Sequence, residues 1–519
     1  MTAAPSRSKR RRNSDSAQSL AALINDWPVD YYKEKHLDPI YGEIQLQPYQ
    51  QCIVATPHFN RLRDLKQMGA AHHVFTNANH TRFSHCIGVA YRATQMYRHL
   101  TSHSLLDQYD ETEEMLVVTA AMCHDLGHGP HSHSFECWAR GKFDHEQMSV
   151  ELVKHAIEND YFWFLNEKTI PAVEDASADN TDNSSVKLAG TKRKYTAPRN
   201  ARQRNFELIR AMIIGVDEKV GRELLPAHKF WLFQIVHNAE HGIDVDKMDY
   251  LIRDMHSVYG SVSPNVRMSQ IIDSTRIVDG RIRFNVSACN QLYEMLYLRA
   301  SMHKNVYTHD SVISVKHMFL DLLDLVDKHS ADSISTAMQK PSSFLMLSDC
   351  VFKPWNTTKR IDDQEMTDLM HKIQTQQYYT VLARCVMFHP PSEDLTVNQL
   401  LQRYRSYGET SEELFFEERS LFIVLTRYDL GNGVNDPLAG KVFYRSTLAG
   451  GEVPCYKTED TSSCFFDSRH SSEYLVRLYC KHPRHQLPVK ALRRLTLCFQ
   501  DLAKRELSAH TQASSIDKQ

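Results

Sequence analysis

The stretch "CHDLGHGPHSHSFE" (residues 123–136) holds four histidines and two acidic residues, directly after the apolar run "EMLVVTAAM". His124 and Asp125 are adjacent at the end of that run, where two glycines and a proline stop a helix. An imidazole and a carboxylate are suitable ligands for a divalent metal ion. The pair predicts half of a metal site, which one more histidine and one more acid would complete.

Two other segments supply residues of the missing types. The stretch "HTRFSH" contains Arg82 and His85, and "HGIDVDKMDYLIRD" contains Asp246. His85 and Asp246 are the candidates to complete the site, although spacing alone does not pair residues so far apart. The alternative is two buried, hydrogen-bonded histidines and two aspartates in salt bridges.

Polar residues also recur at helical spacing in two rows. Residues at i, i+4 and i+8 lie on one face of a helix. The rows are Asp246, Tyr250 and Asp254, and Arg299, His303 and Tyr307. Each row alone is compatible with a solvated or half-buried face.

The order of "RFSH", "CHDLGHGPHSH", "HEQ", "GIDVDKMDY" and "LRASMHKNVYTH" resembles the deoxynucleoside-triphosphate triphosphohydrolases of the sterile-alpha-motif-and-HD-domain type. The resemblance runs from about Tyr32 to Cys480, and the sterile alpha motif module itself is expected to be missing. It implies hydrolysis of dNTPs to deoxynucleoside and triphosphate by metal-assisted attack of water at the α-phosphorus. The implied role is to limit cellular dNTP pools.

The resemblance implies a role for each group of residues. The metal ligands would be His85, His124, Asp125 and Asp246, holding iron, manganese or zinc, with Mg²⁺ accompanying the triphosphate. Arg82 and Lys247 flank these ligands and would bind phosphate; the alternative is a pair of surface charges.

A histidine of "HSH" protonates the leaving group in the resembling enzymes, which is His133 here. His145 would lie close by, and Glu136 occupies a position that is usually aspartate. Its side chain is one methylene longer, and it can still orient or protonate His133. His128 would either touch the phosphates or form a hydrogen bond at the helix end.

The sugar side follows from the same resemblance. Tyr250, Asp254 and Gln67 would meet the 3′-hydroxyl, and Arg299 and His303 would line the nucleotide. Tyr307 would lie where a 2′-hydroxyl would collide, which excludes ribonucleotides.

The regulatory positions depart from the family. The resembling vertebrate enzymes form tetramers when guanine nucleotide and dNTP fill sites between subunits. The residues aligned with the guanine site are Glu34, Ala55, Asn60 and the retained Arg63, and those aligned with the dNTP site are Asn285, Ser287, Asn305, Asp310 and the basic Arg276. We therefore expect an enzyme that needs no guanine nucleotide and is either a constitutive homo-oligomer, dimer or tetramer, or uses another activator.

The expected fold is mainly α, a helical HD-domain core with a smaller α+β C-terminal lobe. The expected division is a disordered basic tail (1–28), the core (29–417) with a mobile insertion (172–204), the lobe (418–508) and a second tail (509–519). Long helices are expected over 82–100, 111–126 and 290–325. Hairpins are expected at "DPIYGEIQL" and at the Asp-Gly of "RIVDGRIRF". Strands are expected at "LFIVLTRYDL", "GKVFYRS" and "SEYLVRLYC".

Composition limits the remaining classes. The net charge of −2 gives no overall basic field for nucleic acid. Eleven cysteines without a CxxC pair indicate free thiols in a reducing compartment. The first 28 residues show no secretory signal, and no apolar run approaches about 18 residues, so no membrane span is expected.

The basic cluster "KRRR" is either a nuclear address or part of a solvated tail. We therefore expect the nucleus, with the cytoplasm as the alternative. Two other functions stay open: another HD-domain phosphohydrolase, such as a nucleotidase or cyclic-nucleotide phosphodiesterase, or a single-stranded nucleic-acid-binding protein with a decayed site. The presence of every implied metal ligand and of both phosphate cations argues against decay, while weak single-stranded nucleic-acid binding is compatible with the enzyme.

Overall fold

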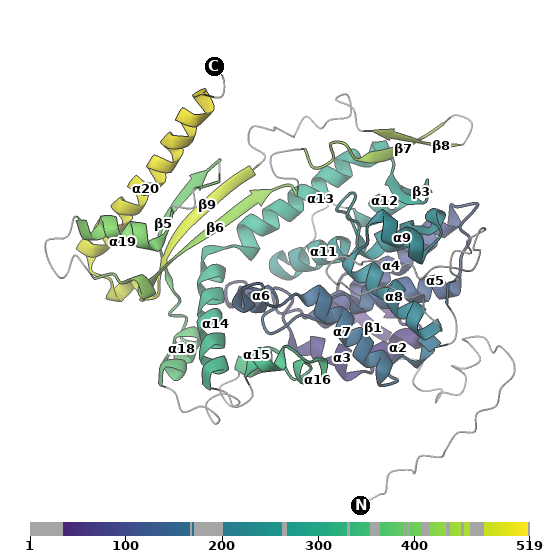
Figure 1. Ribbon diagram of the computed structural model, residues 1–519, viewed down its shortest axis with the longest axis horizontal. Coiled ribbons are helices and arrows are strands. Elements are labelled where there is room, and N and C mark those ends of the chain that lie inside the picture. The colour runs from purple at the N-terminus through teal and green to yellow at the C-terminus, as the bar shows by residue number, and fades with distance from the viewer. Residues whose placement is uncertain are drawn as a thin grey trace, which may run out of the picture.

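The chain folds into a helical body that carries a small antiparallel sheet at one end (Figure 1). The computed structural model describes residues 35–166, 169–170, 201–261, 267–329, 333–352, 364–388, 390–391, 395–406, 415–431, 436–447, 451–456 and 472–516. The N-terminal tail, Glu34 and nearly all of the expected 172–204 insertion lie outside these residues. The mainly helical fold expected from the sequence is confirmed.

The centre of the body is α5 (Glu111–Cys123), which is buried along almost its whole length. Its start is fixed by Asp110, whose side chain accepts hydrogen bonds from the backbone N–H groups of Thr112 and Glu113. Three helices surround it: α4 (Arg82–Ser102), α8 (Ala201–Ile214) and α10 (Trp231–Val236). The apolar run therefore ends inside the protein, and the polar residues after Cys123 begin there.

Three further helices complete the surroundings of this point. They are α6 (His133–Ala139), α7 (His145–Glu158) and α11 (Val245–Tyr259). Asp144 caps α7 and Asp244 caps α11, each accepting a hydrogen bond from a backbone N–H of the first turn. The remaining short helices are α2 (Pro48–Val54), α3 (Pro57–Asn60), α9 (Glu218–Leu224), α12 (Met268–Asp273), α15 (Ile334–Ala337), α16 (Pro341–Phe344) and α18 (Gln364–Gln374).

The long helix expected over 290–325 is wrong as a single element. The structure has α13 (Cys289–Met302), a π-helical turn (His303–Tyr307) and then α14 (Asp310–His329). The interruption is at Thr308, whose backbone N–H and hydroxyl both donate to the carbonyl of His303. A hydroxyl that competes for a backbone carbonyl in this way favours local widening of the helix.

Both expected hairpins are confirmed. Strands β1 (Lys35–Asp38) and β2 (Gly42–Gln45) pair at the N-terminal edge, and β3 (Thr275–Val278) pairs with β4 (Arg281–Phe284). Asp279 and Gly280 both adopt positive φ, at 52° and 70°, as the two central residues of a tight hairpin turn require.

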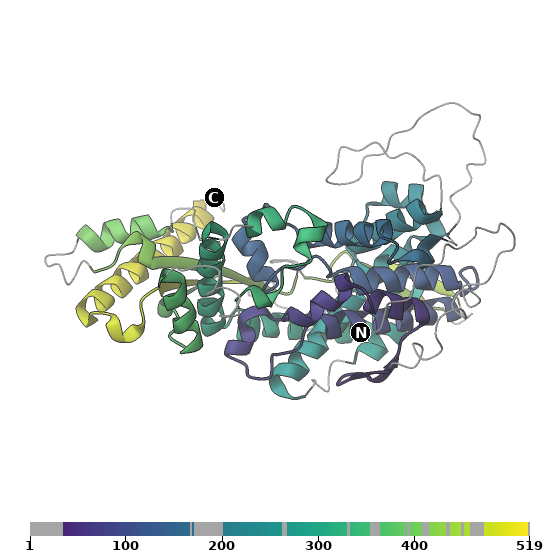
Figure 2. The same cartoon turned by 90° about the horizontal axis from the view of Figure 1, so that it is seen from below.

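The C-terminal sheet has the order β5-β9-β6, formed by Thr380–Met387, Ser472–Cys480 and Leu421–Asp429. Together with α19 (Val397–Ser406) and α20 (Val489–Ile516) it encloses a second hydrophobic core. This lobe is at the left of Figures 1 and 2. Strand β5 and helix α19 precede residue 418, where the lobe was expected to begin. Helix α20 continues past 508, where a tail was expected.

Strand β7 (Val442–Ser446) was expected to belong to the lobe, but it pairs with β8 (Glu452–Tyr456) in a separate sheet. Phe443 of β7 packs in the main helical core. Within the described residues, no helix is long and apolar enough to cross a lipid bilayer.

Candidate functional site

The four predicted metal ligands lie together, although they come from three separate segments of the chain. His85 is in the first turn of α4, His124 and Asp125 follow α5, and Asp246 is in the first turn of α11. The Asp246 Oδ1 atom lies 3.1 Å from His85 Nε2 and 3.4 Å from His124 Nε2. Asp125 Oδ1 lies 3.5 Å from His124 Nε2.

Both imidazole rings present Nε2 to this cluster because their other nitrogen is held. His85 Nδ1 donates to Asp249 Oδ2 at 2.9 Å, and His124 Nδ1 donates to the carbonyl of Ala121 at 2.8 Å. Among the described residues, the buried Nε2 of His124 has no hydrogen-bond partner. Two oriented imidazoles and two carboxylates fit a divalent transition metal, and this unpaired ring nitrogen is suited to bind one.

The electrostatics of the cluster agree with this fit. Burial opposes a charged ring, but hydrogen bonds with Asp246 and Asp249 raise the pKa of His85 to about 10. Despite burial, Asp125 and Asp246 also raise the pKa of His124. The carboxylates therefore stabilise positive charge at this position. A divalent ion would supply that charge in place of the protons on the two histidine rings.

Asp249 is a residue that the sequence analysis missed. Its buried carboxylate also accepts hydrogen bonds from Arg253 Nε at 2.8 Å and from the Tyr41 hydroxyl at 2.7 Å. A Cβ atom on Gly88 of α4 would collide with this carboxylate, so only glycine fits there. The available signal was the i, i+4 spacing of Asp249 and Arg253 next to the predicted ligand Asp246.

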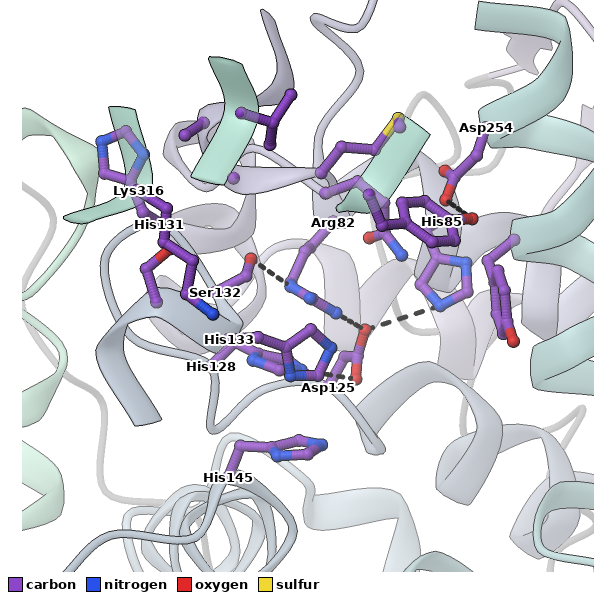
Figure 3. Close-up of a pocket in the computed structure, with 18 of the residues that line it drawn as sticks. Arg82, His85, Asp125, His128, His131, Ser132, His133, His145, Asp254 and Lys316 are labelled. Atoms are coloured by element: carbon purple, nitrogen blue, oxygen red, sulfur yellow. Dashed lines mark hydrogen bonds and ion pairs between the residues drawn. The ribbon is translucent and has the colours of Figure 1, made fainter. Parts of the chain in front are cut away.

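Arg82 places a cation directly beside a metal ligand. Its Nη1 forms an ion pair with Asp125, and its Nε donates to Ser132 Oγ at 2.8 Å (Figure 3). Ser132 has φ 57° and ψ −121°, a costly conformation for a residue with a side chain. Its hydroxyl donates to the carbonyl of Lys66 at 2.9 Å.

A second missed residue, Asp349, holds this turn. Its Oδ1 accepts from the backbone N–H of His131 at 2.7 Å, and its Oδ2 accepts from the backbone N–H of Lys66 at 2.8 Å. His131 also has positive φ, at 55°. Asp349 therefore holds the segment around His131 and Ser132 next to the segment around Lys66, and the hydrogen bond from Ser132 to Lys66 joins the same two segments. No sequence pattern marks it, because its partners are backbone groups more than 200 residues away.

The predicted proton-transfer residues form one cluster. His133 Nδ1 lies 2.8 Å from Glu136 Oε2, and His145 Nδ1 lies 2.5 Å from Glu136 Oε1. Although burial favours the neutral acid, these hydrogen bonds lower the pKa of Glu136 well below its ordinary value. Burial opposes a charged ring on His145, but the bond to Glu136 raises its pKa. The longer glutamate thus holds both histidines.

His128 lies beneath this cluster. Its ring stacks on that of His145 with centroids 3.9 Å apart, and its Nε2 lies 3.3 Å from Asp125 Oδ1. Burial lowers the pKa of His128 well below its ordinary value, so the ring is neutral. His128 thus makes the contact at the end of α5 that the sequence analysis gave as one of its two alternatives, and its partner is the predicted metal ligand Asp125. The ring also lines the pocket described in the next paragraph.

A cavity of about 500 Å³ connects the cluster of predicted metal ligands, called the metal cluster below, with the residues that were predicted to bind the sugar. The predicted residues that line it are Gln67, Arg82, His85, Asp125, His128, His133, His145, Asp246, Tyr250, Asp254, His303 and Tyr307. At the sugar side, Tyr307 donates to Asp254 Oδ2 at 2.7 Å, and His80 bonds the other oxygen of Asp254 at 2.6 Å. Gln67 Oε1 is buried without a hydrogen-bond partner in the part of the chain that the structure describes. His80 is a third residue that the sequence analysis missed.

Four predicted residues do not line this cavity. Glu136 and Arg299 line neither this cavity nor the second cavity of about 250 Å³, which His124 and Lys247 do line. A cation that was not predicted, Lys316, does line the first cavity.

Comparisons with known proteins agree with this geometry. A family model described as "HD domain" matches residues 82–214, a segment that includes His85, His124 and Asp125. "Deoxynucleoside triphosphate triphosphohydrolase SAMHD1 homolog" of Dictyostelium discoideum is 29% identical over 347 residues, which cover 66% of this chain and 58% of that protein. "Deoxynucleoside triphosphate triphosphohydrolase SAMHD1" of Gallus gallus is 27% identical over 478 residues, covering 86% of this chain and 71% of the relative. The protein of the same name from Homo sapiens is 26% identical over 485 residues, covering 86% and 70%.

Proposed function

We propose that this HD-domain phosphohydrolase, homologous over 86% of its length to proteins of the SAMHD1 type, hydrolyses dNTPs to deoxynucleoside and inorganic triphosphate. One observation carries the proposal: the metal cluster opens into the same cavity as the Tyr307–Asp254 pair. A nucleotide whose α-phosphate lies at the cluster has its sugar against that pair.

The chain's own residues supply binding and proton transfer. Arg82 lies in the cavity beside Asp125 and offers a guanidinium to the phosphates. When bound, the divalent ion polarises phosphate oxygens and lowers the pKa of water. Burial lowers the pKa of His133, but its hydrogen bond to Glu136 favours the protonated ring. In that form Nδ1 donates to Glu136 and Nε2 can give its proton to the departing 5′-oxygen.

Sugar selection follows from the opposite wall. The Tyr307 ring is fixed by its hydrogen bond to Asp254 and cannot withdraw from the sugar without breaking it. We therefore assign exclusion of ribonucleotides to Tyr307 and 3′-hydroxyl recognition to Asp254, Tyr250 and Gln67.

The deciding experiment is product analysis. Protein loaded separately with Fe²⁺, Mn²⁺ or Zn²⁺ is incubated with Mg²⁺ and dGTP or GTP, and the products are identified by ³¹P NMR and chromatography. The expected products from dGTP are deoxyguanosine and triphosphate, with far slower turnover of GTP. Release of dGMP with diphosphate, or of phosphate alone, would assign another phosphohydrolase reaction.

In the cell, we propose that this activity limits dNTP pools, and that "KRRR" (residues 9–12) directs the protein to the nucleus. Expression of the active protein should lower cellular dNTPs, whereas a variant without the metal ligands should not. Replacement of the four basic residues by alanine should leave activity in vitro unchanged and move the protein to the cytoplasm.

A further inference from the structure

Lys316 is a cation in the larger cavity that the proposed reaction does not use. It lies on α14 and lines this cavity of about 500 Å³. Among the described residues that line the cavity, Arg82 is the only other lysine or arginine. Arg82 forms an ion pair with Asp125, whereas no carboxylate oxygen in the described part of the chain lies within 4.0 Å of the Lys316 ammonium. Lys316 can therefore serve a ligand.

The contact that Lys316 makes within the protein is weak. Its ammonium donates a hydrogen bond to the Cys137 Sγ atom of α6 at 3.0 Å, and this bond is exposed to solvent. A thiol sulfur is a weak acceptor, and a lysine ammonium has three N–H donors. At least two donors of Lys316 therefore remain for another acceptor.

The wall of the cavity near Lys316 is apolar. Val312 precedes Lys316 by one helical turn, about 6 Å along the axis of α14, and both residues line the cavity. Met68 and Ala70 line it as well, and Met68 packs against the small apolar cluster that contains Val312. An apolar wall with one cation suits a planar ring with a polar edge, whereas a triphosphate requires several cations.

Under the proposed function, the base of the nucleotide lies near this wall. The 3′-hydroxyl meets Asp254, and the 2′ position faces Tyr307, which hydrogen-bonds Asp254. In the sugar ring C2′ lies between C3′ and C1′, and C1′ carries the base, so the base lies beyond the 2′ position. In Figure 3 Lys316 is across the cavity from Asp254, with Arg82 between them. The base therefore extends from Tyr307 toward Val312 and Lys316.

We propose that Lys316 is a specificity-determining residue that hydrogen-bonds the base of the dNTP and favours bases with a carbonyl at that edge. Guanine presents the acceptors O6 and N7 there, and thymine presents O4, whereas adenine and cytosine present an amino donor at the equivalent position. An ammonium has no acceptor for those amino groups. The inference rests on the proposed function, because it takes the sugar to lie against Tyr307 and Asp254.

The first test compares substrates of equal size. The parent protein should have a kcat/KM for dGTP about tenfold above that for dATP, and a kcat/KM for dTTP above that for dCTP by a similar factor. Lys316→Met removes the donor and keeps most of the side-chain length, so both ratios should fall to within about twofold of unity. Lys316→Glu replaces the donor by an acceptor and should reverse both preferences.

The matched control is Lys328→Met. Lys328 is an exposed lysine of the same helix that does not line the cavity, so this variant should keep the ratios of the parent protein. Each ratio is internal to one preparation and does not depend on the amount of folded protein. An equal fall in kcat/KM for all four dNTPs in Lys316→Met would assign Lys316 to the triphosphate and overturn the proposal. Ratios near unity in the parent protein, or ratios that Lys316→Met leaves unchanged, would also overturn it.

The second test locates the contact on the base. The triphosphate of deoxyinosine keeps O6 and lacks the 2-amino group of guanine, whereas the triphosphate of 2-aminopurine deoxyriboside keeps the amino group and lacks O6. The parent protein should hydrolyse the first at a rate close to that of dGTP and the second at a rate close to that of dATP. The opposite order would show that another residue reads the 2-amino group, against the proposal.

Nucleoside binding separates this inference from the proposed function. Deoxyguanosine and deoxyadenosine carry no phosphate, so their dissociation constants from the metal-loaded protein are measured without turnover, whatever reaction the protein catalyses. Tighter binding of deoxyguanosine that Lys316→Met abolishes would support the inference even if no dNTP gave triphosphate, a result that would refute the proposed function alone. Equal dissociation constants in the parent protein would refute the inference and leave the proposed function standing.

Discussion

At the scale of single residues, neighbouring groups hold the predicted metal ligands in place. Asp249 and the Ala121 carbonyl fix both ring nitrogens, and Arg82 fixes Asp125. Hydrogen bonds from neighbouring groups to metal-binding side chains set the orientation of those side chains and the affinity for the metal. The ligands are thus placed before any ion binds.

The combined change His124→Ala and Asp125→Ala should remove the bound transition metal and reduce dNTP hydrolysis to the buffer background. Two of four ligands would be lost, and the remaining pair cannot hold the ion with comparable affinity. Elemental analysis of the dialysed protein measures the metal. The matched control is the double change His99→Ala and Asp273→Ala. The Nδ1 of His99 and the Oδ1 of Asp273 are 4.0 Å apart, and neither residue belongs to the cluster, so this variant should keep its full metal content. Full metal in the first variant would show that the site is misassigned.

Asp349 gives a prediction about pH and stability. Burial raises its pKa to about 6, against the lowering effect of its two backbone hydrogen bonds. In the unfolded chain the pKa of an aspartate is about 3.9. Between about pH 4 and pH 6 the folded protein therefore binds more protons at Asp349 than the unfolded chain does. The free energy of unfolding should therefore fall as pH rises from about 4 to about 6, by about 1–2 kcal/mol.

Asp349→Asn cannot titrate and should lack this part of the slope, which urea unfolding at a series of pH values would detect. Its amide also leaves one of the two backbone N–H groups without an acceptor, so kcat should fall while the metal content stays. Parallel stability slopes in the two proteins would show that the pKa of Asp349 is not raised in the folded protein.

At the scale of elements, the turn between α13 and α14 shapes the sugar wall. The π-helical turn at 303–307 brings Tyr307 against Asp254, 53 residues earlier in the chain. A continuous helix would have carried Tyr307 on the regular row with Arg299 and His303.

Tyr307→Ala should relax discrimination against ribonucleotides because it removes the ring that faces the 2′ position. In Tyr307→Ala the ratio of dGTP to GTP turnover should fall by about tenfold or more. In Tyr307→Phe the ring remains and still excludes the 2′-hydroxyl, so the ratio should stay within about threefold of that of the parent protein. Both variants lose the hydrogen bond to Asp254, so their difference isolates the ring. Equal ratios in the two variants would assign selectivity to the hydrogen bond instead.

The elements with strong patterns could be predicted from sequence. Helix α5 has an apolar run and a clear stop, and the β3–β4 hairpin has Asp-Gly between two strand-like runs. The break at Thr308 could not be foreseen, because a threonine inside a helix takes a neighbouring carbonyl only in some contexts. The site ligands were foreseen through a resemblance, whereas Asp349 and His80 act through contacts that no local pattern encodes.

At the scale of the whole molecule, two residues aligned with the regulatory sites, Asn60 and Asp310, already have partners within one chain. The Asn60 amide donates to the carbonyls of Val54 and Thr56, and Asp310 pairs with Arg477 at 2.9 Å and with Arg384. Ala55 offers no side-chain acceptor for a guanine. Compared with the resembling enzymes, several charged hydrogen bonds to an activating nucleotide would be absent. Each such bond contributes about 1.5–3 kcal/mol to the free energy of binding.

We therefore predict that hydrolysis of dATP or dTTP needs no GTP. Rates with and without GTP should agree, and sedimentation of the same samples should give one oligomeric state that GTP does not change. Strict dependence on GTP, with GTP-driven tetramer formation, would show that other residues rebuild the guanine site. Because dATP and dTTP carry no guanine, the substrate itself cannot supply the activator.

The C-terminal lobe is attached at the turn that carries Tyr307. Thr308 bonds the Tyr428 hydroxyl at 2.7 Å, Lys304 pairs with Glu473 at 2.8 Å, and Asp310 pairs with Arg477. The predicted metal ligands, in contrast, lie on α4 and α11 and directly after α5 in the helical body. Under the proposed function, a change in the lobe that shifts the turn at Tyr307 would alter which sugars fit beside this ring while the metal ligands keep their places.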